Sequence, residues 1–248
     1  MAGRSTGLKL YVDLLSQPAR AVTIFCRVNG IEAEEIYVQV ANGDCRTEEF
    51  KQINSACKVP TIVDDGFKLH ESHAILRYLA TTRNVADHWY PQDPERRALI
   101  DSVLDWHHLN LRYNAFLIIV HRVISVLPGI KKGIYPEHNE AVAEEAKVGL
   151  NRALEYVETV LLNGPNEFLE NQKEVSIADL SLVCEIKQLL WLESSEQEEL
   201  LGSRKRIQAW LEAVEKATNP QFNEVHSKLY GMAKHLQDGR KSKEEASQ

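Results

Sequence analysis

The sequence is short of the features that mark several classes of protein. Its longest apolar stretches, such as residues 115–120, are far shorter than the roughly 20 residues that a membrane-spanning helix needs. Basic residues do not predominate, because 36 acidic side chains outnumber 29 Lys and Arg and give a net charge of −7. That balance disfavours a general attraction to nucleic acid or to an anionic membrane. We therefore expect neither nucleic acid nor a membrane as a partner.

Cysteine is also scarce, and the spacing of the cysteines argues against disulfide-rich, zinc-binding and dithiol redox proteins. The chain has 4 cysteines, which are Cys26, Cys45, Cys57 and Cys184. They form no Cys-x-x-Cys pair and no spacing typical of a zinc site. A disulfide framework or a dithiol redox centre is therefore not expected, and we predict a reduced, cytoplasmic protein.

Histidine is the other common metal ligand, and it is not grouped convincingly along the chain. The pairs His107–His108 and His70/His73 contain the residues that could bind a metal ion. Neither pair has a third ligand placed by the sequence, and packed or solvated histidines are the commoner explanation. We predict no metal site.

What is present is a chain of 248 residues with two distinct patterns of hydrophobicity. Residues 8–83 predict the order strand, helix, strand, helix, hairpin, helix. Residues 84–94 read as a linker that contains Pro91 and Pro94, and residues 95–236 read as helices throughout. Residues 237–248 form a charged tail that we expect to be disordered. The predicted fold is an α/β domain followed by an all-helical domain.

The pair Val59-Pro60 is the first candidate for function. A proline at the start of an apolar strand is an edge feature, a bulge or a cis bond. A cis bond would turn the backbone of Val59 outward, where it could pair with an extended peptide as an added strand does. An ordinary strand-edge proline is the alternative.

Two predicted helix starts supply polar groups that complement this backbone. The hydroxyl of Ser72 and the first N–H groups of its helix could bind a carboxylate, and Glu71 beside them could accept an ammonium group. Ser16 precedes another helix, whose dipole and N–H groups favour an anion such as a thiolate. Plain helix capping remains the alternative for both serines.

Taken together, these segments resemble one family. Residues 13–18 (Asp-Leu-Leu-Ser-Gln-Pro), 58–60 (Lys-Val-Pro) and 71–79 (Glu-Ser-His-Ala-Ile-Leu-Arg-Tyr-Leu) are similar to the glutathione-site motifs of soluble glutathione S-transferases of the theta class. Residues 86–91 and 104–108 resemble the plant theta-type subgroup, and residues 176–179 resemble a helix-cap motif of the family. The resemblance implies a thioredoxin-like N-terminal domain before the helical domain.

The resemblance also implies roles for individual residues. Ser16 would hydrogen-bond the glutathione sulfur, and Pro60 would be cis. The implied glutathione-binding residues are Ser16, Gln17, Cys45, Arg46, Lys58, Val59, Pro60, Glu71 and Ser72. The chain departs from the family pattern at residues 54–57 and at Cys45, where several relatives have a histidine that binds the glycyl carboxylate.

The implied activity is glutathione conjugation to small electrophiles, with reduction of organic hydroperoxides at the same site. Arg112, Tyr113 and Phe116 are the candidates for the electrophile site, and the resemblance implies that a C-terminal helix with Tyr230, Met232 and His235 covers it. Glutathione would be a co-substrate with no permanent cofactor, and the family usually forms homodimers. The alternative is a non-catalytic carrier of apolar ligands, or an interaction module, on the same fold.

Overall fold

The first part of the chain folds into a four-stranded mixed sheet. The computed structural model describes residues 7–246. The strands β1 (Leu8–Val12), β2 (Ala33–Tyr37), β3 (Thr61–Asp64) and β4 (Phe67–His70) lie in the order β2–β1–β3–β4. Strand β1 pairs parallel with β2 and antiparallel with β3, so that Leu10 lies opposite both Glu35 and Ile62. The alternate residues Leu8, Leu10 and Val12 are buried, as expected for a strand with one face on a core.

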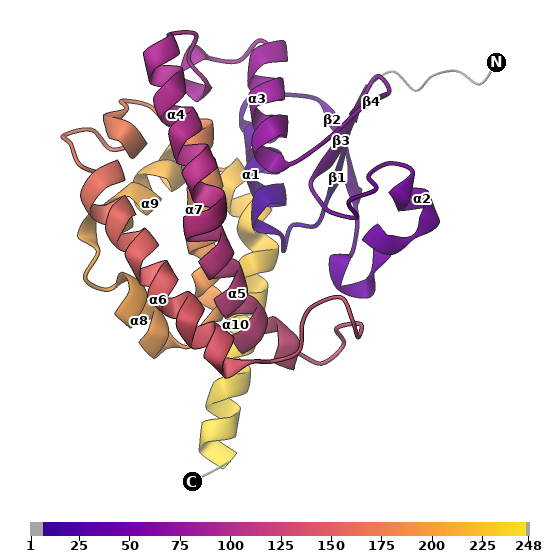
Figure 1. Cartoon of the computed structure of the whole chain (residues 1–248), viewed down its shortest axis with the longest axis vertical. Helices are drawn as coiled ribbons and strands as arrows, with labels where there is room; N and C mark the ends of the chain where they lie inside the picture. The colour runs from indigo at the N-terminus through magenta and orange to yellow at the C-terminus, as the bar shows by residue number, and fades with distance from the viewer. Residues whose placement is uncertain (1–6, 247–248) are drawn as a thin grey trace.

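Helices cover this sheet on both sides. Helices α1 (Gln17–Val28) and α3 (Ser72–Thr82) lie between the sheet and the helical part of the molecule, while the short α2 (Glu48–Lys51) lies on the opposite side (Figure 1). The observed order of elements is strand, helix, strand, helix, hairpin, helix. The sequence prediction for this part of the chain is therefore confirmed.

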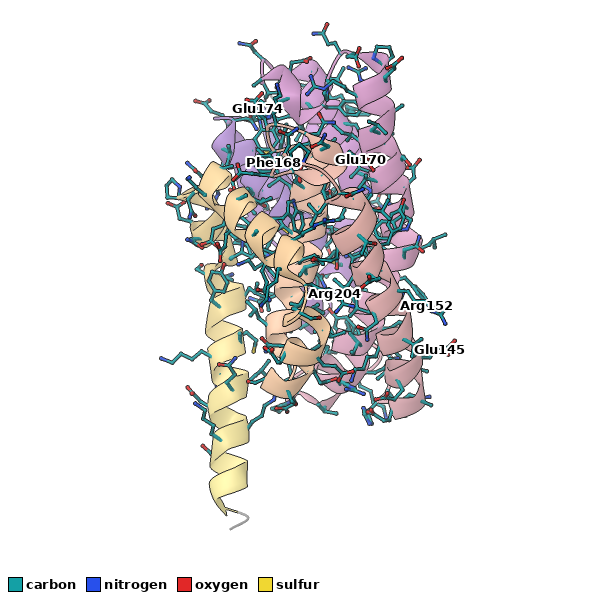
Figure 2. All side chains as sticks on the ribbon, turned by 90° about the vertical axis from the view of Figure 1, so that its left-hand side faces the viewer. Glu145, Arg152, Phe168, Glu170, Glu174 and Arg204 are labelled. Atoms are coloured by element: carbon teal, nitrogen blue, oxygen red, sulfur yellow. The ribbon has the colours of Figure 1, made fainter. Side chains whose placement is uncertain are left out.

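The remainder of the described chain is helical, as predicted. Its α-helices are α4 (Pro94–His107), α5 (Tyr113–Arg122), α6 (Glu140–Tyr156), α7 (Ile177–Gln188), α8 (Ser194–Leu201), α9 (Lys205–Thr218) and α10 (Gln221–Ala246). Where the sequence pattern suggested one long helix after residue 95, a π-helical turn, η4 (His108–Arg112), separates α4 from α5. Such π-turns are common at functional sites because they redirect side chains within a continuous helix. Charged side chains such as Glu145 and Arg152 project outward from α6 (Figure 2).

Helix α7 is the centre of the helical core. Its side chains are buried on all faces from Ile177 to Ile186, which explains its near-continuous apolar sequence. The predicted capping box is confirmed, because the Asp179 carboxylate accepts from the Ser176 N–H at 2.8 Å. The same carboxylate accepts from the indole N–H of Trp210 at 2.8 Å. The start of α7 is therefore fixed to α9 as well as capped.

The C-terminal end differs from the disordered tail that the sequence suggested for residues 237–248. Helix α10 continues to Ala246 and extends beyond the other helices (Figure 1). The Arg240 guanidinium donates to the backbone carbonyls of Trp191 at 2.7 Å and Leu192 at 2.9 Å, and it pairs with Glu193. These contacts hold the helix where its own sequence is mostly charged. Residues 247–248 lie outside the described chain. Within the described residues, no helix combines the length and apolar character needed to cross a bilayer.

Candidate active site

A cavity of about 610 Å³ lies between the sheet domain and the helical part of the chain. The predicted site residues in its wall are Ser16, Gln17, Cys45, Arg46, Lys58, Val59, Arg112, Tyr113 and Phe116. The fold thus brings both predicted halves of the site, the peptide-binding residues and the electrophile-site candidates, to one cavity. Pro60, Glu71 and Ser72 are not in its wall.

Ser16 is the N-cap of α1, as predicted, but its hydroxyl does not act as a capping group. Its backbone is extended (φ −84°, ψ 123°), and the side chain makes no hydrogen bond to the helix. The carbonyl of Ser16 accepts from the Arg20 N–H at 3.0 Å, so the backbone starts the helix without the side chain. The hydroxyl is therefore free to donate to a ligand in front of the positive end of the helix dipole.

A buried arginine holds this serine segment in place. The Arg20 side chain is fully buried, and it donates to the carbonyls of Leu14 at 3.1 Å and Leu15 at 3.2 Å. Its other amino group donates to the Cys184 carbonyl at 3.0 Å and the Gln188 amide oxygen at 2.8 Å. Arg20 thus ties the segment before Ser16 to α7. An arginine on the otherwise apolar face of a predicted helix is the signal that could have identified Arg20, but the sequence reasoning gave this residue no role.

The Val59–Pro60 peptide bond is cis, which confirms the expectation for Pro60. Pairing of β3 with β1 begins at Thr61, so Val59 lies outside the ladder. The side-chain amide of Asn54 donates to the Lys58 carbonyl at 3.0 Å and to the Thr61 hydroxyl at 2.9 Å. This buried asparagine, which the sequence reasoning left without a role, fixes the loop before the proline.

Glu71 and Ser72 begin α3, but in different positions from those expected. Glu71 is the N-cap residue, with φ 69° and ψ 113°, and Ser72 is the first helical residue. A positive φ is unusual for glutamate and occurs mostly where the surrounding structure requires it. The exposed Glu71 side chain makes no capping hydrogen bond, while Ser72 is buried. The Glu71 carboxylate therefore does not cap its own helix.

Cys45 and Arg46 lie in the short turn η2 (Asp44–Arg46) at another edge of the cavity. The Cys45 side chain is buried, and burial together with the Asp13 carboxylate raises its pKa to about 11. The Arg46 guanidinium donates to the carbonyls of Gly133 at 2.9 Å and Ile134 at 3.3 Å. It therefore connects the sheet domain to the loop that follows α5.

The electrophile-site candidates stand on the far wall, on η4 and α5. Arg112 is paired with Glu185, a fully buried carboxylate whose pKa burial raises. Tyr113 is exposed and Phe116 half-buried. Further wall residues that sequence reasoning missed are Ile119, Ile124, Leu127, Ile130, Ile134, Tyr135, Gln188 and Trp191. Six of them lie within residues 119–135, while Gln188 and Trp191 come from the end of α7 and just after it, so no single local pattern groups them.

Met232 of α10 also lines the cavity, as the expectation of a covering C-terminal helix requires. Tyr230 and His235, which were named with it, are not in the wall. The Tyr230 hydroxyl instead donates to the Asn223 side chain at 3.4 Å. One residue of α10 therefore contributes to the site directly.

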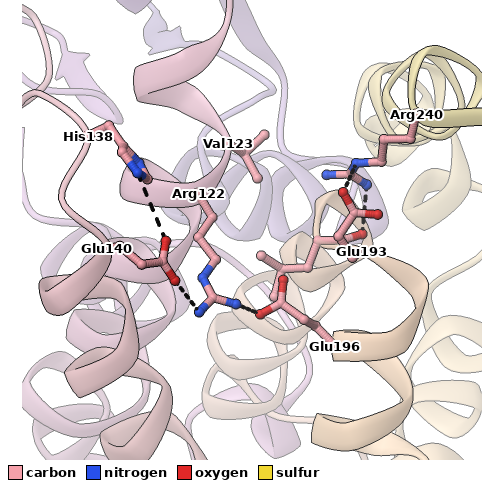
Figure 3. Close-up of a pocket in the computed structure, with 8 residues that line it drawn as sticks. Arg122, Val123, His138, Glu140, Glu193, Glu196 and Arg240 are labelled. Carbon is pink, nitrogen blue, oxygen red and sulfur yellow. Dashed lines mark hydrogen bonds and ion pairs between the residues drawn. The ribbon is translucent and has the colours of Figure 1, made fainter. Parts of the chain in front are cut away.

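A second hollow, of about 310 Å³, is lined by charged residues of α5, α6, α8 and α10. Figure 3 shows Arg122 between Glu140 and Glu196. Arg240 and Glu193 form another pair across the hollow. The arginines and glutamates of this hollow are paired with one another, so it has neither the apolar wall nor the free polar groups of a substrate site.

Comparisons with known proteins agree with this geometry. The family model of the glutathione S-transferase N-terminal domain matches residues 7–81. Glutathione S-transferase T1 of Arabidopsis thaliana is 44% identical over 94% of this chain and 93% of its own length. The T2 protein of the same plant is 45% identical over 90% of this chain, which spans only 37% of that longer relative.

A solved structure extends the agreement to the fold. Human glutathione transferase theta-2, in complex with glutathione and an unknown ligand, has a TM-score of 0.82 and 33% identity over 94% of this chain and 91% of its own. The expected thioredoxin-like domain followed by a helical domain is confirmed. The chain therefore belongs to the theta class of the glutathione S-transferase family and is a glutathione transferase.

Proposed function

We propose that Ser16 and the N-terminus of α1 together activate the thiol of glutathione. The observation that carries the proposal is the Ser16 hydroxyl, which lies in the cavity wall and makes no capping bond to its helix. A free thiol with a pKa near 8.5 is mostly protonated at neutral pH. A hydroxyl donor to an anion contributes about 1.5–3 kcal/mol, and a helix N-terminus contributes up to about 2 kcal/mol. Together they are sufficient to lower the thiol pKa by about two units.

The peptide part of glutathione would lie along the sheet-domain side of the cavity. The backbone of Val59, outside the β-ladder, is available to the cysteinyl unit, with Gln17 beside it. The start of α3 at Glu71 and Ser72 would bind the γ-glutamyl end, because it offers a carboxylate next to free helix N–H groups. The glycyl carboxylate would approach Lys58 and Arg46, with Cys45 behind them.

The electrophile would bind on the helical side. Phe116 and the aliphatic wall suit an apolar body, while Arg112 and the Tyr113 hydroxyl can interact with a leaving group that becomes negative. The thiolate attacks the electrophilic carbon, its electron pair forms the new C–S bond, and the leaving group departs with the electrons of the old bond. The thiolate would attack the terminal oxygen of an organic hydroperoxide in the same position, and the O–O bond would break to release the alcohol and leave glutathione sulfenic acid. A second glutathione would then reduce the sulfenic acid, forming glutathione disulfide and water.

We further propose that the protein is a cytoplasmic homodimer. All four cysteines are free thiols, as is usual in a reducing compartment. Phe67 on β4 is 50% exposed and Leu109 on η4 is 78% exposed, so each half of the chain presents a large apolar side chain to solvent. Light scattering on the wild type and on Phe67→Ser and Leu109→Ser tests the dimer, and a monomeric wild-type protein would refute it.

The test of function is glutathione binding by calorimetry combined with turnover of a panel of small electrophiles and hydroperoxides. We expect the wild type to bind glutathione and conjugate at least one electrophile, and Ser16→Ala to bind glutathione but react slowly. Failure of the wild type to bind glutathione would favour the carrier function instead. Equal rates for the wild type and Ser16→Ala at every pH would refute the role of Ser16.

A further inference from the structure

Three histidine side chains from the two halves of the chain meet beside α3. His73 is the second residue of α3, His107 ends α4, and His108 begins η4. One ring nitrogen from each lies within 4.8 Å of the others. His73 and His107 are 3% and 2% exposed, and His108 is half-buried. The fold thus supplies the third imidazole that the sequence alone did not place.

The two buried rings already have the separation of metal ligands. His73 Nε2 and His107 Nδ1 are 3.2 Å apart. Two nitrogens bound to one tetrahedral Zn²⁺ at 2.0–2.1 Å are about 3.4 Å apart. The ring centroids of His73 and His108 are 4.2 Å apart, so His108 needs a side-chain rotation and no large movement to bring a nitrogen to the same ion.

The two buried rings hydrogen-bond to each other through His73 Nε2 and His107 Nδ1, which leaves one nitrogen of each ring over. Within the described residues, His73 Nδ1 and His107 Nε2 are buried without a hydrogen-bond partner. Buried polar atoms normally have a partner, and each one left without is destabilising. Coordination through the other nitrogen of each ring would leave these two atoms as N–H groups, but it would stabilise the buried pair by replacing their mutual hydrogen bond with bonds to the ion.

The rings are in the form that binds metal. Burial lowers the pKa of His73 to about 3, and it lowers the pKa of His107 and His108 as well. Neutral imidazole offers a lone pair at neutral pH, so only the ring that donates in the His73–His107 hydrogen bond has to move its proton to its other nitrogen when an ion binds. This protonation state supports coordination but does not by itself require it.

The neighbouring guanidinium groups of Arg77 and Arg112 disfavour positive charge on the cluster, but each is paired with carboxylates. Arg77 is paired with Asp101 at 2.6 Å and with Asp105 at 3.3 Å. Arg112 is paired with the buried Glu185. Both guanidinium groups near the cluster therefore have a carboxylate partner, which removes most of their repulsion toward a bound ion.

We propose that His73, His107 and His108 bind one divalent transition-metal ion of the Zn²⁺ type. Water would complete four-fold coordination. A set of three imidazoles selects Zn²⁺, Co²⁺ or Ni²⁺ over Mg²⁺ and Ca²⁺, which prefer oxygen ligands. The ion would join α3 of the sheet domain to α4 and η4 of the helical part.

The experiment uses the full chain after treatment with a chelator. Calorimetric titration with Zn²⁺ should show one ion per chain, and Co²⁺ should give the visible absorption of a tetrahedral site. Thermal unfolding should shift upward by several degrees at saturating Zn²⁺, because the ion binds only the folded arrangement. These readouts do not depend on glutathione or on turnover.

His108→Gln is the decisive variant, because the half-buried side chain can change without opening the core. We expect it to weaken Zn²⁺ binding at least 100-fold and to abolish the thermal shift. His70→Gln is the matched control, since His70 is exposed three residues before His73 and outside the cluster. The proposal is overturned if the wild type does not bind Zn²⁺, if His108→Gln binds it equally well, or if binding is lost only when the thiols are alkylated.

Discussion

The guanidinium of Arg20 donates to the side-chain oxygen of Gln188 at 2.8 Å, across the boundary between the sheet domain and the helical core. Both side chains are at most 1% exposed. Because the same arginine bonds the carbonyls of Leu14 and Leu15, one buried cation positions the segment before Ser16. The location of the proposed thiol-activating hydroxyl thus depends on a contact with α7, more than 160 residues away in sequence.

Arg20→Met should be strongly destabilising. The substitution keeps an unbranched side chain of similar length, but it leaves three carbonyls and the Gln188 side-chain oxygen without their donor. Each buried acceptor left unpaired costs about 1–3 kcal/mol, so we expect a loss of at least about 3 kcal/mol. Urea unfolding measures the loss. Arg152→Met, at an exposed position on α6 (Figure 2), is the control and should change stability by no more than about 0.5 kcal/mol. Equal effects of the two substitutions would contradict the anchoring role.

Arg46→Lys should affect the loop after α5 and glutathione binding together. Lysine retains the charge but loses the fork that reaches the carbonyls of Gly133 and Ile134. We expect faster tryptic cleavage at Lys131 and Lys132. We also expect the KM for glutathione to rise about 5-fold, which corresponds to a loss of about 1 kcal/mol of binding free energy. Arg97→Lys, which alters a bond to the Pro91 carbonyl away from the cavity, is the control. An unchanged cleavage rate would show that Arg46 does not hold this loop.

Cys57 should be the most reactive of the four thiols toward an alkylating reagent. Burial raises the pKa of Cys26 and Cys184 to about 12 and that of Cys45 to about 11, so their thiolates are rare at neutral pH. Cys57 is half-buried and lines the cavity. Peptide mapping after brief alkylation at pH 7.5 should find Cys57 modified first, and S-methylglutathione should slow the modification. Faster labelling of Cys45 would mean that its turn opens readily.

Stability should fall below pH 6.5 because of buried neutral histidines. Burial holds the pKa of His226 well below its usual value in the folded chain, while the unfolded chain binds a proton near pH 6.5. Unfolding then takes up a proton, so stability decreases as the pH falls, by about 1.4 kcal/mol per pH unit for this residue. Between pH 7.5 and 5.5, the free energy of unfolding measured in urea should fall by about 1.4 kcal/mol less for His226→Phe than for the wild type. His235→Phe, exposed on the same helix, should match the wild type.

Local signals in the sequence were sufficient to predict the order of helices and strands in the sheet domain and the peptide-binding side of the site. The largely apolar segment at residues 8–15 predicted β1, the Ser176–Asp179 box identified the start of α7, and Val59-Pro60 suggested the cis bond that the structure contains. Each of these depends on residues within a few positions of one another. Such patterns specify a backbone conformation directly.

Contacts between residues far apart in the sequence could not be predicted from such local patterns. The Arg20–Gln188 bond and the meeting of His73 with His107 are set by how helices pack, which no local pattern encodes. The tail was misjudged for the same reason, because Arg240 gains its partners from the segment before α8. The π-turn at η4, which directs Arg112 to Glu185, likewise has no signature in hydrophobic periodicity.

The pKa of the thiol of bound glutathione tests the central claim most directly. It can be followed by the ultraviolet absorbance of the thiolate as the complex is titrated with base. For the wild type we expect a value about two units below the 8.5 of a free thiol, because Ser16 and the N-terminus of α1 both stabilise the anion. In Ser16→Ala the pKa should rise by about one to two units, with glutathione still bound. An identical thiol pKa in the two complexes would contradict the account.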